Sequence, residues 1–170
     1  AEKGADVYHV DIAKDSSDAL NKWATENKKK VSSQFGDILD LDIGENKYDI
    51  IYLNGIYQHI EKPALALVKL INSLKPNGIM YMGFYRSGEF KFFIVDAIRY
   101  LIEMSMIKEV RDINSILFTF NQLNHYNSTR VMDDFFIPKK HNFHPNDVIH
   151  DLKLIGGEVF YFDDDFRDYV

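Results

Sequence analysis

Three polar side chains follow short predicted strands and are of types that hold polar ligands. They are Asp11 after Asp6–Val10, Asp37 after Val31–Phe35, and Asn54, with Gly55 beside it, after Tyr48–Leu53. Asp6–Val10 and Tyr48–Leu53 are rich in β-branched and aromatic residues, which is typical of a β-strand. Because a carboxylate accepts several hydrogen bonds at once, an aspartate at a strand end is suited to hold two neighbouring hydroxyl groups.

Segments of helical periodicity separate these strands and would set their order in a sheet. A helix is predicted to begin at the N-capping residues Asp15 and Ser16. Pro63 suits the first position of the next helix, and Lys75–Gly78 has the composition of a tight turn before a strand at Ile79–Phe84. Strands that alternate with helices across short joints predict an α/β fold with a doubly wound sheet and helices on both faces.

The ends of the predicted strands would lie at one edge of that sheet. Tyr48–Leu53 is nearly continuously apolar, as expected for a strand buried on both faces. Ligands of doubly wound sheets bind beyond the carboxyl ends of the strands, where an acidic residue can accept hydrogen bonds from ribose hydroxyl groups. Asp11 is placed for that contact, Asp37 for the exocyclic amine of adenine, and Asn54 for the other side of the cleft. The alternative is that these residues only form turns.

The second half of the chain is predicted to carry a helical insertion before the last strand. Residues 88–143 are apolar and unusually aromatic, and we expect them to form a substrate lid within one partial domain over residues 1–170. The expected elements are a helix at Phe90–Met106, a helix at Val110–Asn124, a helix that opens at Pro145 and ends at Gly156, and a strand at Glu158–Phe162.

Composition narrows the class of protein. The chain has 170 residues, of which 46% are apolar and 14% aromatic, enough for one folded domain. A formal net charge of -6 and a single short basic cluster, Lys28–Lys30, argue against a nucleic-acid partner. The sequence has no cysteine, no signal peptide and no apolar run that would span a bilayer, so we expect a cytoplasmic protein without a membrane partner.

Several stretches resemble the class I S-adenosylmethionine-dependent methyltransferases in order and spacing. GADVYHVDIAKDSSDAL, FGDILDLDIGENKYDIIYLNGIYQHI and LKPNGIMYMGFY resemble their second to fifth strands, and DDFFIPKKHNFHPNDVIHDLKLIGGEVF resembles the segment before their sixth strand. The resemblance implies a Rossmann-like fold, S-adenosylmethionine as cofactor, and methyl transfer to a small-molecule or metabolite acceptor.

The resemblance also implies which residues contact the cofactor. These are Asp11 and Ile12 for the ribose diol and the adenine face, Asp37 and Ile38 for the adenine amine and a backbone N–H to the ring, and Asn54 and Gly55 for the methionine end.

The sequence departs from the family pattern at both ends. Family members open with a strand and a glycine-rich loop that approaches the methionine part of the cofactor, and this sequence has no such loop. A seventh strand is not found after Phe162. Because buried strands with unpaired edges are unfavourable, we expect an incomplete sheet that lacks its first and seventh strands and that a missing segment or another chain completes.

Candidate catalytic residues lie before the last predicted helix. A hydroxyl acceptor would benefit from a general base, and His141 and Asp134 are close in sequence to the predicted substrate side. We interpret His59 as a packed or capping side chain, and His144 as a residue of the N-cap region of the last helix. Histidines and aspartates recur over 133–150, but nothing fixes three or four converging ligands, so we expect no metal.

Functions of different class remain open from the sequence. One is a methyltransferase that acts on a small molecule. The other is a methyltransferase-like binding or scaffold domain that has lost the glycine-rich loop and does not turn over. A nicotinamide-dependent oxidoreductase is a third interpretation, because an acidic residue after the second strand also suits that cofactor, although Asp37 and the LKPNG turn fit it less well.

Overall fold

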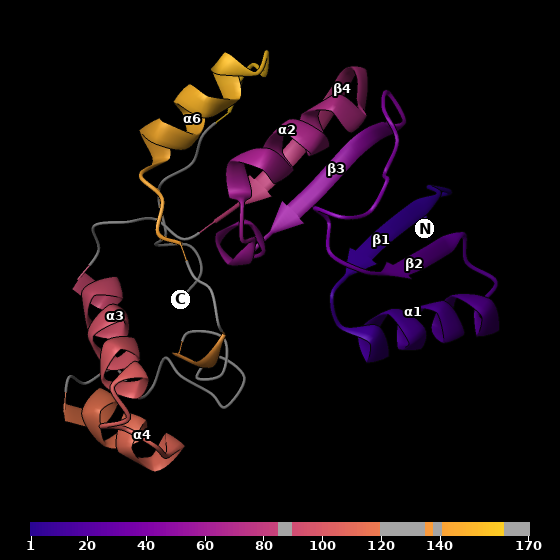
Figure 1. Ribbon diagram of the computed structural model, residues 1–170. Coiled ribbons are helices and arrows are strands. Elements are labelled where there is room, and N and C mark those ends of the chain that lie inside the picture. The colour runs from indigo at the N-terminus through magenta and orange to yellow at the C-terminus, as the bar shows by residue number, and fades with distance from the viewer. Residues whose placement is uncertain (85–89, 120–134, 138–140, 162–170) are drawn as a thin grey trace. The chain divides into compact units, whose positions relative to one another are not determined.

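The computed structural model describes residues 1–84, 90–119, 135–137 and 141–161 (Figure 1). The elements are β1 (Val7–Asp11), α1 (Lys14–Glu26), β2 (Val31–Phe35), β3 (Tyr48–Asn54), η1 (Tyr57–His59), α2 (Pro63–Ser73), β4 (Leu74–Gly83), α3 (Phe90–Glu103), α4 (Val110–Thr119) and α6 (Pro145–Leu154). The chain divides into two compact units, formed by Ala1–Ile51 with Ala64–Met80 and by Tyr52–Pro63 with Tyr81–Val170.

The strands β1 and β2 form a parallel pair that α1 connects. Their register runs from Val7 opposite Val31 to Asp11 opposite Phe35. The helix α1 lies along this pair (Figure 1) and buries Ala24. The predicted strand–helix–strand alternation is therefore confirmed here, and β2 has the bounds that the sequence predicts.

The start of α1 differs from the prediction. The helix begins at Lys14, and its N-cap is Ala13, which makes no side-chain capping bond. Asp15 and Ser16 therefore lie inside the first turn, where the charge of Asp15 suits the helix dipole. The cap was wrongly placed because Asp11 already turns the chain here: its Oδ1 accepts a hydrogen bond from the Ala13 N–H at 2.8 Å.

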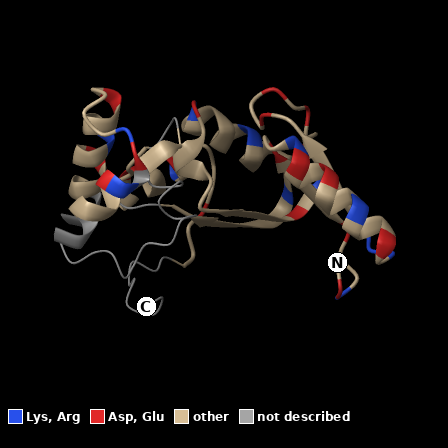
Figure 2. Ribbon diagram, turned by 90° about the horizontal axis from the view of Figure 1, so that it is seen from below, with Lys and Arg blue, Asp and Glu red and all other residues tan. Residues whose placement is uncertain are grey.

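Charged side chains of both signs follow one another along α1 (Figure 2). Lys14 pairs with Asp18, and Lys22 lies 4.0 Å from Glu26 at the same spacing. All four side chains are exposed, so these ion pairs add little to stability. They mark the solvated face of the helix.

Asn21 ties α1 to β2 through hydrogen bonds in both directions. Its Nδ2 donates to Ser33 O at 2.8 Å, and its Oδ1 accepts from Ser33 N at 2.7 Å. We expect Asn21→Ala to lower the free energy of unfolding by about 1–3 kcal/mol, because both backbone groups of Ser33 lose this partner. Urea unfolding beside Asn27→Ala measures the effect, since exposed Asn27 bonds only within its own helix. An equal loss of unfolding free energy in the two variants would contradict a stabilising role of the Asn21–Ser33 hydrogen bonds.

The strands β3 and β4 form a second two-stranded sheet among the described residues. The prediction that β3 is buried on both faces was wrong, because Ile50 and Tyr52 are each 70% exposed and only Leu53 is buried. Tyr52 stacks on Tyr81 of β4 with ring centroids 5.0 Å apart. A pair of strands leaves more surface uncovered than a full sheet does, which agrees with the predicted incomplete sheet.

The predicted turn at Lys75–Gly78 is absent, because β4 begins at Leu74 and includes these residues. Asn77 takes a φ of +64°, so the left-handed conformation expected of a turn occurs within the strand. A Cβ added to Gly78 would lie 2.9 Å from Lys75 O in its own strand and 3.1 Å from Tyr48 O in β3. The local backbone and the approach of β3 therefore both require glycine here.

The helices α3 and α4 share an apolar core. Its buried members are Ile94, Val95, Ile98, Ile107, Ile113 and Phe135. The helix α3 ends at Glu103, earlier than predicted, because Ser105 adopts a left-handed φ of 58° and Met106 N donates to Leu101 O at 2.9 Å. The helix α4 is described as far as Thr119, and the rest of its predicted range lies outside the described residues.

The helix α6 follows its sequence signals closely. His144 caps it, with Nδ1 accepting from Asn146 N at 3.3 Å, and Pro145 opens it. Gly156 has a φ of +85° just after its end, and Gly157 N donates to Leu152 O at 2.8 Å. Residues 158–161 do not form the predicted strand, and Phe162 lies outside the described residues. Within the described residues, the helices are too short or too polar to cross a membrane.

Candidate functional site

Asp11 and Asp37 lie at the same edge of the β1–β2 pair. Asp11 is the last residue of β1 and stands opposite Phe35, the last residue of β2. Gly36 N donates to Asp11 O at 2.9 Å, and Asp37 follows directly. The two residues therefore both lie at the carboxyl ends of adjacent parallel strands, where the sequence predicts a ligand.

Each of these carboxylates uses one oxygen to hold its own turn. Asp11 Oδ1 accepts from Ala13 N, and Asp37 Oδ1 accepts from Leu39 N, both at 2.8 Å. The interpretation of these residues as turn formers is thus correct in part. In the described part of the chain, no hydrogen bond or ion pair is recorded for the second oxygen of either, so each carboxylate can still accept from a ligand.

The neighbouring residues give this edge an apolar side. Ile12 is 75% exposed directly after Asp11, and Ile38 is half-buried beside Asp37. Lys69 of α2 fixes the loop after β2, since its Nζ donates to Leu39 O at 3.0 Å. An exposed isoleucine next to carboxylates suits a flat ring that carries polar groups on its edge.

Asn54 ends β3 and is followed by Gly55 in the left-handed region, with a φ of +68°. Gly55 N donates to Gly83 O at 2.9 Å. A Cβ added to Gly83 would lie 2.1 Å from Asn54 Oδ1, so the side chain of Asn54 rests directly on this glycine. The amide of Asn54 is therefore held close to the end of β4.

His141 lies against the segment that follows Gly55. Its backbone N donates to Gln58 O at 2.7 Å, and its ring centroid lies 5.9 Å from that of Phe143. Its Nε2 is buried, and among the described residues it has no hydrogen-bond partner. A general base needs a nitrogen that is not already engaged, so His141 stays a candidate for that role.

Other histidines and aspartates recur over 133–150, among them the candidate base Asp134. Asp133 and Asp134 lie outside the described residues. His144 is the N-cap of α6, as expected of a residue before Pro145. Across the described ranges, no group of three histidine, aspartate or glutamate side chains could hold a metal ion.

Tyr57 forms the centre of an aromatic cluster. It is 1% exposed, and its ring centroid lies 4.7 Å from that of Phe143 and 6.1 Å from that of Phe84. Burial raises the pKa of the Tyr57 phenol to about 12, and the Asp151 carboxylate acts in the same direction. Tyr57 is therefore a neutral packing residue at physiological pH.

The raised pKa of Tyr57 predicts a loss of stability in alkali. The folded protein holds the phenol proton more tightly than the unfolded chain, so the free energy of unfolding falls as the pH rises from about 10 toward 12. We expect the free energy of unfolding to be about 1 kcal/mol lower at about pH 11 than at about pH 9, and we expect Tyr57→Phe to lack this loss. Urea unfolding at about pH 9 and about pH 11 measures it, with Tyr100→Phe, an exposed tyrosine, as the control. An equal alkaline loss in wild type and Tyr57→Phe would contradict the assignment.

Gln58 is a residue of this region that the sequence did not single out. It is completely buried, its Nε2 donates to Gly55 O at 2.7 Å, and its Oε1 has no partner. The sequence gives only a weak signal for it, a polar residue between Tyr57 and His59.

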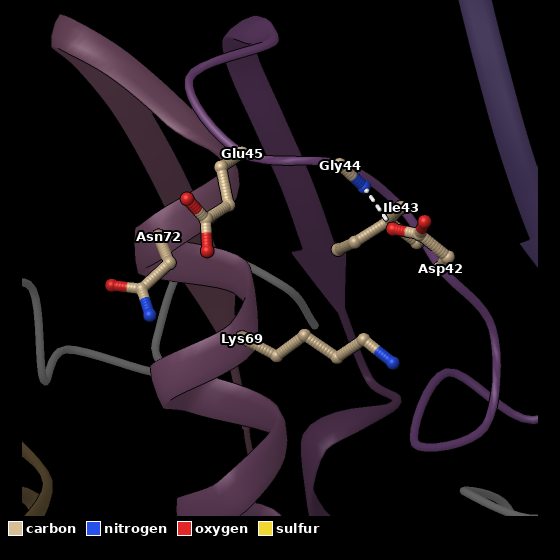
Figure 3. Close-up of a pocket in the computed structure, with 6 residues that line it drawn as sticks. All are labelled: Asp42, Ile43, Gly44, Glu45, Lys69 and Asn72. Atoms are coloured by element: carbon tan, nitrogen blue, oxygen red, sulfur yellow. Dashed lines mark hydrogen bonds between the residues drawn. The ribbon is translucent and has the colours of Figure 1, made fainter.

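A surface hollow of about 150 Å³ lies between the loop before β3 and α2 (Figure 3). Its lining residues are Asp42, Ile43, Gly44, Glu45, Lys69 and Asn72. The two carboxylates are exposed, and Asp42 Oδ1 already accepts from Gly44 N at 2.9 Å. None of the predicted site residues lines this hollow, so it gives the predicted ligand no additional contact.

Comparisons with known proteins agree with the predicted family. Residues 1–82 match the family model described as a methyltransferase domain. The structure resembles PKMT2 from Rickettsia typhi, with a TM-score of 0.70 at 19% identity, covering 87% of this chain and 33% of that one. PKMT2 in complex with AdoHcy gives 0.68 at 18% identity, covering 87% and 34%.

A putative methyltransferase from Bacillus halodurans is also similar, with a TM-score of 0.55 at 13% identity, covering 88% of this chain and 52% of that one. No curated protein matches the sequence. The chain thus spans about a third to a half of the length of these solved structures.

Proposed function

We infer methyl transfer from S-adenosylmethionine for this chain, which has the class I methyltransferase fold and matches, over residues 1–82, the family model of a methyltransferase domain. The observation that carries the proposal is the pair of carboxylates at the ends of β1 and β2. Asp11 and Asp37 stand beyond adjacent parallel strands, and each keeps an oxygen that is not used in its own turn. An adenosine group presents the matching donors, two ribose hydroxyls and an exocyclic amine.

The adenosine end of the cofactor is assigned to the β1–β2 edge. Asp11 accepts from the ribose hydroxyls, and exposed Ile12 covers one face of the adenine ring. Asp37 accepts from the adenine amine, and the backbone N–H of Ile38 donates to the ring. The two aspartates are already held by Ala13 N and Leu39 N, so little conformational freedom is lost when the ligand binds.

Asn54 and Gly55 are assigned to the methionine end. The side chain of Asn54 contacts Gly83, which restrains the start of this short segment. Asn54 then offers an amide for the polar groups of the amino acid, and Gly55 presents no side chain to obstruct them.

The acceptor is proposed to be a small molecule, with His141 as the general base. Bound S-adenosylmethionine supplies an activated methyl group, so the protein mainly positions the acceptor and removes its proton. Among the described residues the Nε2 of His141 has no hydrogen-bond partner, and this nitrogen is proposed to receive that proton. Asp134, which lies outside the described residues, is proposed as a second candidate for the group that removes the proton.

Calorimetric titration of S-adenosylhomocysteine into the intact protein that carries this chain tests the proposal. We expect saturable binding, followed by methyl transfer when S-adenosylmethionine and a panel of small hydroxyl and amine acceptors are supplied. Titration of NAD⁺ is the control, because an acidic residue after a strand also suits that cofactor. Binding without transfer would favour a scaffold domain, and no binding of S-adenosylhomocysteine would overturn the proposal.

A further inference from the structure

Gln58 connects two segments to which the proposed function gives separate roles. It lies in η1, and its residue surface is 0% exposed. Its side-chain Nε2 donates to Gly55 O at 2.7 Å, which holds the segment proposed for the methionine end. Its backbone O accepts from His141 N at 2.7 Å, which holds the segment that carries the proposed base.

The direction of the side-chain bond follows from its partner. Gly55 O can only accept, so the amide of Gln58 must turn Nε2 toward it. The remaining Oε1 is buried without a partner, which costs free energy in any folded protein. Leucine or methionine would fill the same volume without that cost, which makes a packing role alone a poor account of glutamine here.

The hydrogen bond from Gln58 restricts a backbone position that is otherwise flexible. Its φ of +68° is one that residues other than glycine rarely adopt, and glycine itself is flexible there. A hydrogen bond from a buried side chain restricts that freedom. Because the same residue also binds the backbone of His141, the conformation of the segment at Gly55 and the position of His141 are linked through Gln58.

We propose that Gln58 is a positioning residue that sets the conformation of the Asn54–Gly55 segment and joins it to the segment of His141. This inference rests on the proposed function, since it assigns Gln58 an effect on cofactor binding. Gln58 itself touches neither cofactor nor acceptor in this scheme. Its side-chain bond to Gly55 is the part that substitution can remove, because the bond to His141 uses the backbone.

Binding of S-adenosylhomocysteine to variants of the intact protein tests this role. Gln58→Met keeps the length of the side chain but cannot donate, and we expect its dissociation constant to rise about tenfold. Gln34→Met is the matched control, because Gln34 is exposed and accepts only from the Tyr8 hydroxyl. Thermal unfolding of each variant establishes that binding is measured on folded protein.

A pH profile of Gln58→Glu separates positioning from packing. A buried carboxyl has a raised pKa, so at acidic pH the neutral acid can donate to Gly55 O as the amide does. We expect binding to this variant to be weak at about pH 8 and to recover at about pH 5, relative to wild type at the same pH. The ratio to wild type removes the pH dependence that the two proteins share.

The outcomes distinguish this inference from the proposed function. If wild type does not bind S-adenosylhomocysteine, the proposed function is wrong and this inference falls with it. If wild type binds and folded Gln58→Met binds equally well, or Gln58→Glu gives a flat ratio across the pH range, the inference alone is wrong. Weaker binding of Gln58→Met and acid recovery of Gln58→Glu together are the result that we expect.

Discussion

Replacing Asp11 with alanine is expected to weaken the binding of S-adenosylhomocysteine to the intact protein by about 30-fold. That factor corresponds to about 2 kcal/mol, the scale of hydrogen bonds to a charged group. The variant loses the carboxylate oxygen that the proposed function assigns to the ribose hydroxyls. Calorimetric titration gives the dissociation constant directly.

Two further variants separate this contact from the turn that Asp11 also forms. Asp11→Asn keeps an oxygen for the bond from Ala13 N but removes the charge, so we expect a normal fold with about tenfold weaker binding. Asp6→Ala removes a carboxylate that pairs with Lys30 at 3.2 Å, and we expect it to bind as wild type does. Unchanged affinity in folded Asp11→Ala would refute the ribose assignment.

The β1–α1–β2 unit could be predicted from the sequence because its signals are local. A short run of β-branched and aromatic residues predicts β1, a short segment ended by Gly36 and Asp37 predicts β2, and the parallel pairing follows from the helix between them. The shared edge of Asp11 and Asp37 follows in turn, since a carboxyl end is fixed once strand direction is known. Their roles toward a ligand remain predictions.

Other parts of the fold could not be predicted because one residue type serves several purposes. Asn77 and Gly78 predict a turn, but β4 runs through both residues, and a Cβ on Gly78 would meet Lys75 O of this strand and Tyr48 O of β3. Asp15 and Ser16 read as caps, but Asp11 turns the chain first. In each case a contact with another part of the chain, or an earlier turn, decides the outcome.

Partly buried hydrogen bonds from side chains to the backbone could not be predicted from the sequence either. Asn21 binds Ser33, Lys69 binds Leu39 O, and Gln58 binds Gly55 O. Hydrophobic periodicity cannot reveal them, because a polar residue on an apolar face breaks the pattern in the same way whether it is bonded or exposed. They nevertheless fix the segments proposed to bind the cofactor.

Leu67 on α2 is expected to give the largest loss of stability of any substitution considered. Its side chain is 1% exposed, whereas Leu65 on the same helix is 55% exposed. Leu67→Ala leaves a cavity in addition to removing buried apolar surface, so we expect the free energy of unfolding to fall by about 2–5 kcal/mol.

Leu65→Ala makes the same chemical change at an exposed position of α2 and changes helix propensity equally. We expect it to cost under about 1 kcal/mol, because little buried surface is removed. Urea unfolding of both variants measures the difference as a shift in midpoint at constant slope. Equal losses would mean that the exposed face of α2 is covered in the protein in solution, and would contradict the burial on which the comparison rests.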